Sequence, residues 1–195
     1  AQRAGIKVFA TGGIGGVHRG WQGSLDISAD LRELACRSVT VVCSGAKALL
    51  DLPSTLEYLE TMGIPVIGLA TETLPAFFSI DSGLALRQSA SDIEEVVEII
   101  THRRSLKLNG GEVIAVPPPS SFALPWNQIK EWVNKAISEA RAADIRNQFL
   151  TPFLLDRIAE LSEGRTILVN IALIQNNAKV AGQLAVLLNQ GRSYE

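Results

Sequence analysis

The sequence predicts an α/β fold in which helices cover both faces of a largely parallel central sheet, a three-layer α/β/α sandwich. Short apolar runs, typical of strands buried on both faces, alternate along the chain with segments of helical periodicity. The first two runs each end in a glycine-bearing loop, as strands do at the ligand-binding edge of an α/β sheet. With 195 residues, 47% of them hydrophobic, the chain is long enough to bury the core of one domain.

The first expected strand runs from Ile6 to Thr11 and leads into a loop rich in glycine. Glycine lets the backbone adopt positive φ and approach a ligand closely. The loop contains Gly12, Gly13, Gly15, Gly16 and Gly20. A helical pattern through Leu31 and Leu34 follows, so this part of the chain is expected to form a strand, a loop and a helix.

No standard nucleotide motif explains the glycine loop. The dinucleotide pattern G-x-G-x-x-G fails because His18 stands where its third glycine should be. The Walker A pattern fails because Lys47 follows Ala46, and no Gly-Lys-Ser or Gly-Lys-Thr occurs. Two interpretations stay open: a tight turn, or an anion site in which His18 and Arg19 act beside backbone N–H groups.

The second expected strand, 38–43, delivers Lys47 just beyond its carboxyl end. We expect a short helix over 46–50 that ends near Pro53. Lys47 lies between two apolar runs, and an amine that is partly desolvated at a strand end is a better nucleophile than one in water. From spacing alone, a structural lysine that extends its amine to the surface is at least as plausible.

A further helix begins near Ser54 or Thr55, either of which can cap it, and ends before Gly63. The third expected strand covers 65–70. Glu72 follows that strand and could be a catalytic carboxylate by position. The simpler interpretation is a solvated loop residue, because strand-end loops are usually polar.

The rest of the chain alternates between helices and one strand. A capping box at 91–94 predicts the start of a helix. A strand at 112–116 is stopped by three prolines, and helical spacing of apolar residues covers 129–140. Thr151 and Pro152 predict the next helix start, as N-cap and first helical residue. The apolar segment 166–189 is too polar for a membrane span and is expected to form a core or interface helix, before a frayed tail of five residues.

Composition excludes several classes of protein. A net charge of −2 gives no reason to expect binding to nucleic acid or to a membrane surface. Cys36 and Cys43 are too few and wrongly spaced for a CxxC site or a disulfide framework, which favours a reducing compartment. No signal peptide or membrane-spanning run is present, so we expect a cytoplasmic protein, or an organellar one whose targeting segment has been lost.

The motifs of the chain resemble those of the pseudouridine-5'-phosphate glycosidase family, also called indigoidine synthase A-like proteins. The matching segments are GGIGGVHRG, LDISADLREL, VVCSGAKALLD, TLEYLETMGIPVIG, LPAFF, NGGEVIAVP, TPFLLDRIAEL and NIALIQNNAKVA. They are long, ordered and spread over nearly the whole chain. Ser44 and Ala48 depart from the family pattern, in which Ala and Ser are commoner at these positions; both flank Lys47, and neither change removes a reacting group.

The resemblance implies roles for particular residues. Lys47 matches the family's nucleophile, which forms an imine with the ring-opened sugar phosphate, and Asp26 matches its ligand for Mn²⁺ or another divalent cation. The implied substrate-binding residues are Ser28, Ala29, Asp30 and Asn170, with Thr11, Gly12, Gly13 and His18 as our candidates for holding the 5'-phosphate. Without the resemblance, Asp26 would be a turn residue, Ser28 a helix cap, and Asn170 the donor of a structural hydrogen bond.

The implied activity is reversible cleavage of pseudouridine 5'-phosphate to ribose 5-phosphate and uracil, by a homotrimer. The family's general acid is a glutamate from its N-terminal portion; nothing in this sequence matches it, and Glu72 does not fit the pattern. We therefore expect residues 1–195 to form a single domain, the C-terminal portion of a longer family domain whose N-terminal segment is missing. The alternatives are a synthase that joins ribose 5-phosphate to another aromatic acceptor, and a non-catalytic module that binds sugar phosphates.

Overall fold

The computed structural model describes residues 1–145 and 149–190. Its centre is a five-stranded sheet in which every neighbouring pair of strands is parallel. The strands are β1 (Val8–Ala10), β2 (Thr40–Cys43), β3 (Val66–Leu69), β4 (Gln88–Ala90) and β5 (Glu112–Ala115), in the order β1-β2-β5-β3-β4. The expected α/β fold with a parallel sheet is confirmed, and β5, the last of these five strands in sequence, lies at the centre of the sheet.

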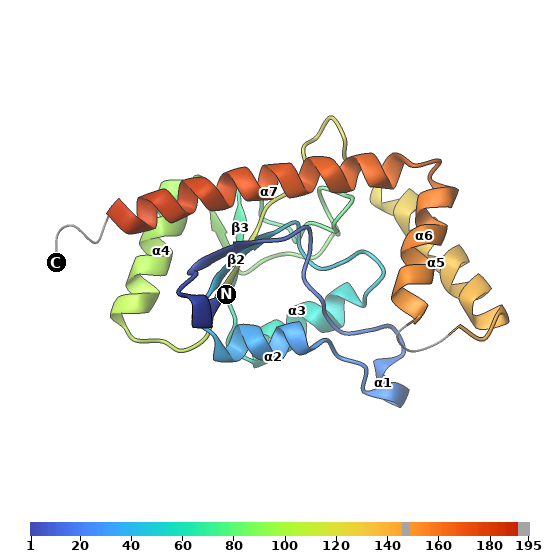
Figure 1. The fold of residues 1–195 in the computed structure, drawn as a ribbon, viewed down its shortest axis with the longest axis horizontal. Helices are drawn as coiled ribbons and strands as arrows, with labels where there is room; N and C mark the ends of the chain where they lie inside the picture. The colour runs from blue at the N-terminus through green and yellow to red at the C-terminus, as the bar shows by residue number, and fades with distance from the viewer. Residues whose placement is uncertain (146–148, 191–195) are drawn as a thin grey trace.

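Helices cover both faces of the sheet. They are α1 (Trp21–Ser24), α2 (Ala29–Cys36), α3 (Leu52–Thr61), α4 (Ile93–Ser105), α5 (Trp126–Ala142), α6 (Leu150–Leu161) and α7 (Arg165–Gln190), after a short 3-10 helix at Gln2–Ala4. In Figure 1, α2 and α3 lie on one side of the sheet, α4 and α7 lie on the other, and α5 packs beside α6 at one end. The arrangement is the expected three-layer sandwich.

The alternation of side chains along each strand divides the core into two parts. Val41 and Cys43 of β2 belong to the part that faces α2 and α3, whereas Val42 belongs to the part that faces α4 and α7. Neighbouring β5 repeats the pattern with Val113 and Ile114. Apolar residues therefore occupy both faces of the inner strands, as a parallel sheet between two helical layers requires.

Strand β1 is shorter and less buried than the sequence predicts. It covers three residues of the expected six and pairs with β2 alone in the described part of the chain. It is an edge strand of the described sheet, and its Phe9 is 47% exposed. The expected strand was longer by two residues at its start, Ile6 and Lys7, and by one at its end, Thr11; these three residues lie outside the observed strand.

The expected short helix over 46–50 is wrong. Ala46 instead forms a parallel bridge with Ile14, and a turn follows in which the N–H of Leu50 donates to the carbonyl of Lys47 at 3.0 Å. The next helix begins earlier than expected, since Asp51 is the N-cap of α3 and accepts a hydrogen bond from the N–H of Ser54. The proline at 53 therefore lies in the first turn of α3, where it fits, and does not end a helix.

Three smaller differences have local causes. Strand β4 was not expected, because its Gln88-Ser89-Ala90 segment carries no apolar run. Helix α4 is capped by Asp92, whose Oδ1 accepts from the N–H of Glu95, and not by Ser91. Both residue types cap well, and a glutamate stands three residues after each of them, so the sequence pattern fits either cap. Helix α6 begins at Leu150, one residue before the expected cap at Thr151. The predicted frayed tail lies outside the described residues.

Helix α7 is 26 residues long, which would be enough to cross a membrane. Polar residues interrupt it, and no helix in the described part of the chain is apolar enough for such a span.

Candidate active site

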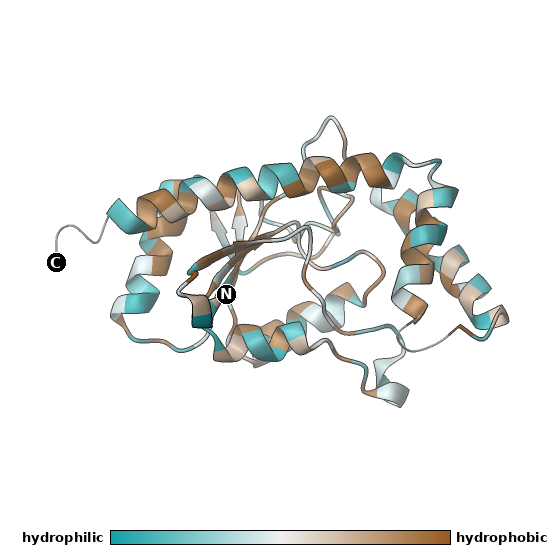
Figure 2. Ribbon diagram, in the orientation of Figure 1, coloured by the Kyte–Doolittle hydropathy of each residue, from teal (hydrophilic) through white to brown (hydrophobic). Residues whose placement is uncertain are grey.

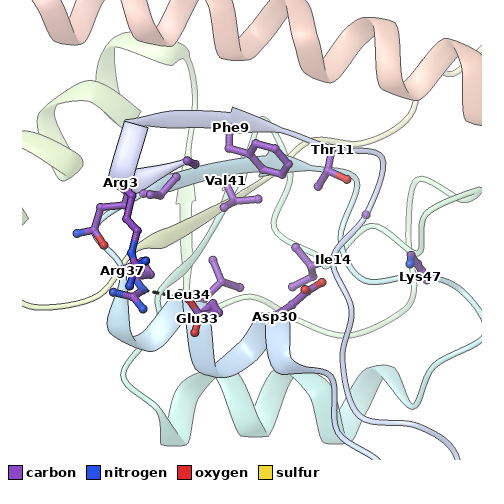
Figure 3. Close-up of a pocket in the computed structure, with 14 residues that line it drawn as sticks. Arg3, Phe9, Thr11, Ile14, Asp30, Glu33, Leu34, Arg37, Val41 and Lys47 are labelled. Carbon is purple, nitrogen blue, oxygen red and sulfur yellow. Dashed lines mark hydrogen bonds and ion pairs between the residues drawn. The ribbon is translucent and has the colours of Figure 1, made fainter. Parts of the chain in front are cut away.

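A cavity of about 690 Å³ lies beside the first two strands and α2. Figure 3 shows Arg3 and Arg37 at one end of it and Lys47 at the other, with Asp30 between them. Of the residues that the sequence predicts for the site, the lining contains Thr11, Gly13, Asp30 and Lys47. Sequence analysis missed the far end, where Arg37 donates to the carboxylate of Glu33 at 3.0 Å. In the sequence, the signal for this end of the cavity was Arg37, a basic residue just before the second buried strand.

Lys47 reaches this cavity from the turn after β2. The turn is held by two hydrogen bonds, from the N–H of Lys47 to the carbonyl of Ile14 at 3.1 Å and from Leu50 back to Lys47. The residues on either side of Lys47 are buried, while Lys47 itself is partly exposed. Its amine makes no hydrogen bond or ion pair with another described residue. A rigid backbone therefore carries an amine that is free to meet a ligand.

The glycines of the loop are required mainly for close packing. We expected positive φ here, yet in this loop only Gly20 adopts it, with φ 79°. A Cβ on Gly13 would lie 2.6 Å from the ring of Phe77, and a Cβ on Gly15 would lie 2.2 Å from the hydroxyl of Ser28. Gly16 is similarly confined, by Thr55 at 2.5 Å. Side chains distant in sequence close around the loop, so its path cannot accommodate a Cβ.

Asp30 connects the glycine loop to the cavity. Its Oδ2 accepts a hydrogen bond from the N–H of Gly15 at 2.8 Å, and the residue also lines the cavity. Ser28 is the N-cap of α2 and accepts from the N–H of Asp30 at 3.2 Å, so the simpler interpretation of Ser28 as a helix cap is confirmed. Ala29 is the exposed first residue of α2 and is not part of the cavity lining.

His18 and Asp26 lie together, outside the cavity lining. Nδ1 of His18 is 3.7 Å from Oδ2 of Asp26, and the two side chains are 24% and 55% exposed. The described residues contain no group of three or more His, Cys, Asp or Glu side chains that could hold a metal ion. A single exposed carboxylate fits only a hard cation whose other ligands are mostly water, which is the kind of site that the sequence predicts.

Asn170 approaches the glycine loop from α7. Its Oδ1 is buried without a hydrogen-bond partner in the described structure, and it would lie 3.3 Å from a Cβ on Gly12. A buried acceptor without a partner calls for an explanation, and a ligand that donates a hydrogen bond would provide one. Neither Asn170 nor Gly12 belongs to the cavity lining.

Two other polar side chains point elsewhere. Glu72 is exposed and outside the cavity, which agrees with its interpretation as a solvated loop residue. Arg19 donates to Oδ1 of Asn134 on α5 at 2.9 Å. Burial lowers the pKa of Arg19, partly opposed by the negative charge of Asp51. Arg19 lines a second cavity of about 350 Å³ and is not part of the lining of the first cavity.

Asn177 was missed by sequence analysis. It is fully buried and hydrogen-bonds to Thr11 and Ser44, which stand at the ends of β1 and β2. Its position on the buried stripe of α7, with Val169, Leu173 and other apolar residues, was the available signal, because an amide among apolar residues at helical spacing implies a specific partner.

The chain is similar to a family of known proteins over nearly its whole length. Residues 1–187 match the model of the family described as indigoidine synthase A like protein. The chain is 52% identical over 193 residues to a pseudouridine-5'-phosphate glycosidase of Methylobacterium nodulans, covering 99% of this chain and 57% of that protein. It is also 52% identical, over 190 residues, to the protein of the same name from Caldanaerobacter subterraneus, covering 97% of this chain and 62% of the relative.

Two solved structures share the fold. The prealnumycin C-glycosynthase, in complex with ribulose 5-phosphate, superposes with a TM-score of 0.94 at 31% identity, covering all of this chain and 64% of that one. An indigoidine synthase A-like protein from Thermotoga maritima gives a TM-score of 0.85 at 36% identity, over 95% of this chain and 61% of that one. The chain thus spans about six-tenths of the length of the proteins it matches. On the family match and these identities, the chain belongs to the indigoidine synthase A-like protein family.

Proposed function

We propose that the protein is a pseudouridine-5'-phosphate glycosidase that interconverts pseudouridine 5'-phosphate and water with ribose 5-phosphate and uracil. The observation that carries the proposal is the meeting of Lys47, Thr11, Gly13 and Asp30 in one cavity beside the strand ends. An amine, backbone N–H groups and a carboxylate are the groups needed to bind a sugar phosphate and react with its anomeric carbon. Relatives that carry this name at about 50% identity support it.

In the proposed reaction, Nζ of Lys47 attacks the anomeric carbon, and the bond from that carbon to the ring oxygen breaks. The ring opens, and its oxygen becomes a hydroxyl by taking the proton that the amine loses. The nitrogen lone pair then forms the C=N bond of the imine as the C–C bond to uracil breaks. The electron pair of that bond moves to the uracil carbon, which takes up a proton from a general acid. Water then hydrolyses the imine, which releases ribose 5-phosphate and frees the amine. A covalent intermediate suits this substrate because it divides one difficult step into two easier ones.

The other residues bind and orient the substrate. The N–H of Thr11 donates to the carbonyl of Val42 at 3.0 Å, so the hydroxyl of Thr11 and the backbone N–H groups of Gly12 and Gly13 would hold the phosphate, together with the imidazole of His18. Asp30 and the start of α2 at Ser28 and Ala29 would bind sugar hydroxyls, and Asn170 would accept a hydrogen bond from the substrate through its buried Oδ1. Asp26 would hold Mn²⁺ or another divalent cation through its carboxylate and water, and the cation would supply positive charge near the phosphate.

Borohydride reduction with ribose 5-phosphate tests the nucleophile, using the protein expressed from its complete reading frame. A stable adduct should form on Lys47, and the Lys47→Ala variant should form none and release no uracil. Lys179→Ala is the matched control, because this exposed lysine of α7 lies outside the cavity. An adduct on Lys179, or uracil release by Lys47→Ala at the wild-type rate, would refute the proposal.

A C-ribosylating synthase is the second candidate, favoured by the close superposition on the prealnumycin C-glycosynthase. Both activities use the same lysine and sugar phosphate and differ in the aromatic acceptor. Uracil release from pseudouridine 5'-phosphate separates them, since a synthase for another acceptor would trap ribose 5-phosphate on Lys47 without releasing uracil. A non-catalytic module would bind the sugar phosphate and form no adduct.

We also propose that the protein is a homotrimer with α7 in its interface. The first half of α7 exposes large apolar side chains: Ile167, Leu168, Ile171 and Ile174 are each at least 45% exposed. Figure 2 shows this half of the helix as a strongly hydrophobic stretch of the ribbon. Contiguous exposed apolar residues favour a protein interface. Sedimentation should give three times the monomer mass, and Leu168→Glu should reduce it; an unchanged mass in that variant would argue against this interface.

A further inference from the structure

Helix α7 has one amide in the middle of its buried face. That face contains Thr166, Val169, Ala172, Leu173, Asn177, Ala181 and Leu184. Val169 and Leu173 belong to the same hydrophobic cluster as buried residues of α5 and α6, whereas Ala181 and Leu184 belong to the cluster that contains buried residues of α4. Asn177 lies between the two groups, where α7 passes the first two strands (Figure 1), and its side chain is 0% exposed. Burying an amide is unfavourable unless it is hydrogen-bonded, so an apolar residue would be the simpler choice here.

The amide of Asn177 connects two strand ends. Nδ2 donates to the carbonyl of Thr11, just beyond β1, at 2.9 Å. The same nitrogen lies 3.2 Å from the hydroxyl of Ser44, just beyond β2, and that hydroxyl is 3.4 Å from Oδ1. These partners are 166 and 133 residues away in the chain, so the contacts exist only in the folded protein.

Ser44 is itself fixed on three sides. Its N–H donates to the carbonyl of Gly12 at 2.9 Å, its carbonyl accepts from the N–H of Phe77 at 2.9 Å, and its side chain contacts Asn177. Phe77 in turn packs its ring against Gly13 and has a left-handed backbone, with φ 62°. Ser44 is therefore the point where the glycine loop, the strained turn of Phe77 and α7 meet, three residues before Lys47.

We infer that Asn177 is a positioning residue for the reaction of Lys47. It anchors Thr11 of the glycine loop and Ser44 of the lysine turn to one rigid helix, so that the two loops keep a fixed separation. Asn177 does not line the cavity, so it acts through these loops and not on the substrate. The inference rests on the proposed function, because it assigns the lysine turn and the glycine loop to the reacting amine and the phosphate.

Loss of the Asn177 amide should affect the rate at which Lys47 reacts more than the binding of the sugar phosphate. Backbone hydrogen bonds join the loops directly, from Ile14 to Gly45 at 3.0 Å and from Ser44 to Gly12, and these remain without the amide. The phosphate loop therefore keeps its shape, and binding persists. The angle of approach of the amine is what changes, and a displacement of about 1 Å lowers such rates by up to about 100-fold.

The test is Asn177→Leu in the protein expressed from its complete reading frame, since leucine has the same branched shape without the polar atoms. The rate of borohydride trapping on Lys47 at saturating ribose 5-phosphate should fall by about tenfold, part of the range expected for misplaced groups. KM should change by less than about threefold, because no direct ligand contact is removed. Trapping at the wild-type rate by a folded Asn177→Leu protein would overturn the inference.

Two further variants separate positioning from stability. Thr166→Ala removes a buried hydroxyl contact, 2.9 Å from Ser162, on the same helix but away from the strand ends, so its rate should stay within about twofold of wild type. Ser44→Ala keeps the bond from Asn177 to Thr11 and should lose about threefold in rate, and it decides the question if Asn177→Leu does not fold. An unchanged rate in Ser44→Ala would then refute the inference, as would an equal loss in Thr166→Ala. Absence of any adduct on wild-type Lys47 would refute the proposed function itself.

Discussion

Replacing Gly45 by alanine should be far more damaging than an ordinary glycine substitution. Gly45 follows β2 with a left-handed backbone, φ 78°, and its Cβ would lie only 2.1 Å from the carbonyl oxygen of Pro75. That carbonyl cannot retreat easily, because Ala76 and Phe77 beyond it are buried and Phe77 is hydrogen-bonded to Ser44. Both the backbone conformation and the space are therefore closed to a side chain.

The two penalties can be estimated separately. A left-handed non-glycine residue costs about 1–2 kcal/mol. Overpacking at a rigid contact adds about 1–3 kcal/mol. Gly63 is the matched control, because it has a similar φ of 69° and no atom within 4 Å of its Cβ. Gly63→Ala should show the first penalty alone, and Gly45→Ala both.

Thermal unfolding measures the difference. For a chain of this size, 1 kcal/mol corresponds to about 2–4 °C in Tm, so Gly45→Ala should unfold about 2–12 °C below Gly63→Ala. The same displacement would move the turn that carries Lys47 and reduce borohydride trapping. Equal losses of Tm in the two variants would show that the Pro75 carbonyl yields freely, and the packing argument would be wrong.

Three further predictions concern charges and thiols. Asp26→Asn should raise the divalent-ion concentration needed for activity while Tm stays unchanged, because Asp26 is exposed; activity that survives complete chelation would contradict the metal site. Burial raises the pKa of Cys43 to about 12, so a thiol reagent at pH 8 should modify Cys36 in the folded protein and leave Cys43 unmodified; two equivalents of reaction would contradict this. A hydrogen bond from Arg157 lowers the pKa of Glu139, so this pair stabilises the fold above the ordinary glutamate pKa of about 4.3, and its contribution is lost as pH falls through the lowered value. Denaturant unfolding of Glu139→Gln should therefore differ from wild type at pH 7 and converge with it in acid; a constant difference would be the contrary result.

The sequence by itself determined most of the strands and helices of the sandwich. The inner strands are runs of apolar residues bounded by glycine and proline, such as 112–116, and such runs form buried strands in any α/β context. Helical spacing of apolar residues likewise determined α3, α5 and α7, although not their first residues. Caps were misjudged at Ser91 and Thr151, because neighbouring residues compete for one cap and only the completed helix selects between them.

Only the tertiary structure decided what the loops require. The glycine at 13 is needed because Phe77 lies against it, and Asn177 is buried because Thr11 and Ser44 receive its hydrogen bonds. The segment 46–50 is a turn and not a helix, because Ile14 pairs with it from a distant part of the chain. Local periodicity reflects the core that each segment faces, whereas these features depend on contacts between residues far apart in sequence, which exist only once the strands have assembled.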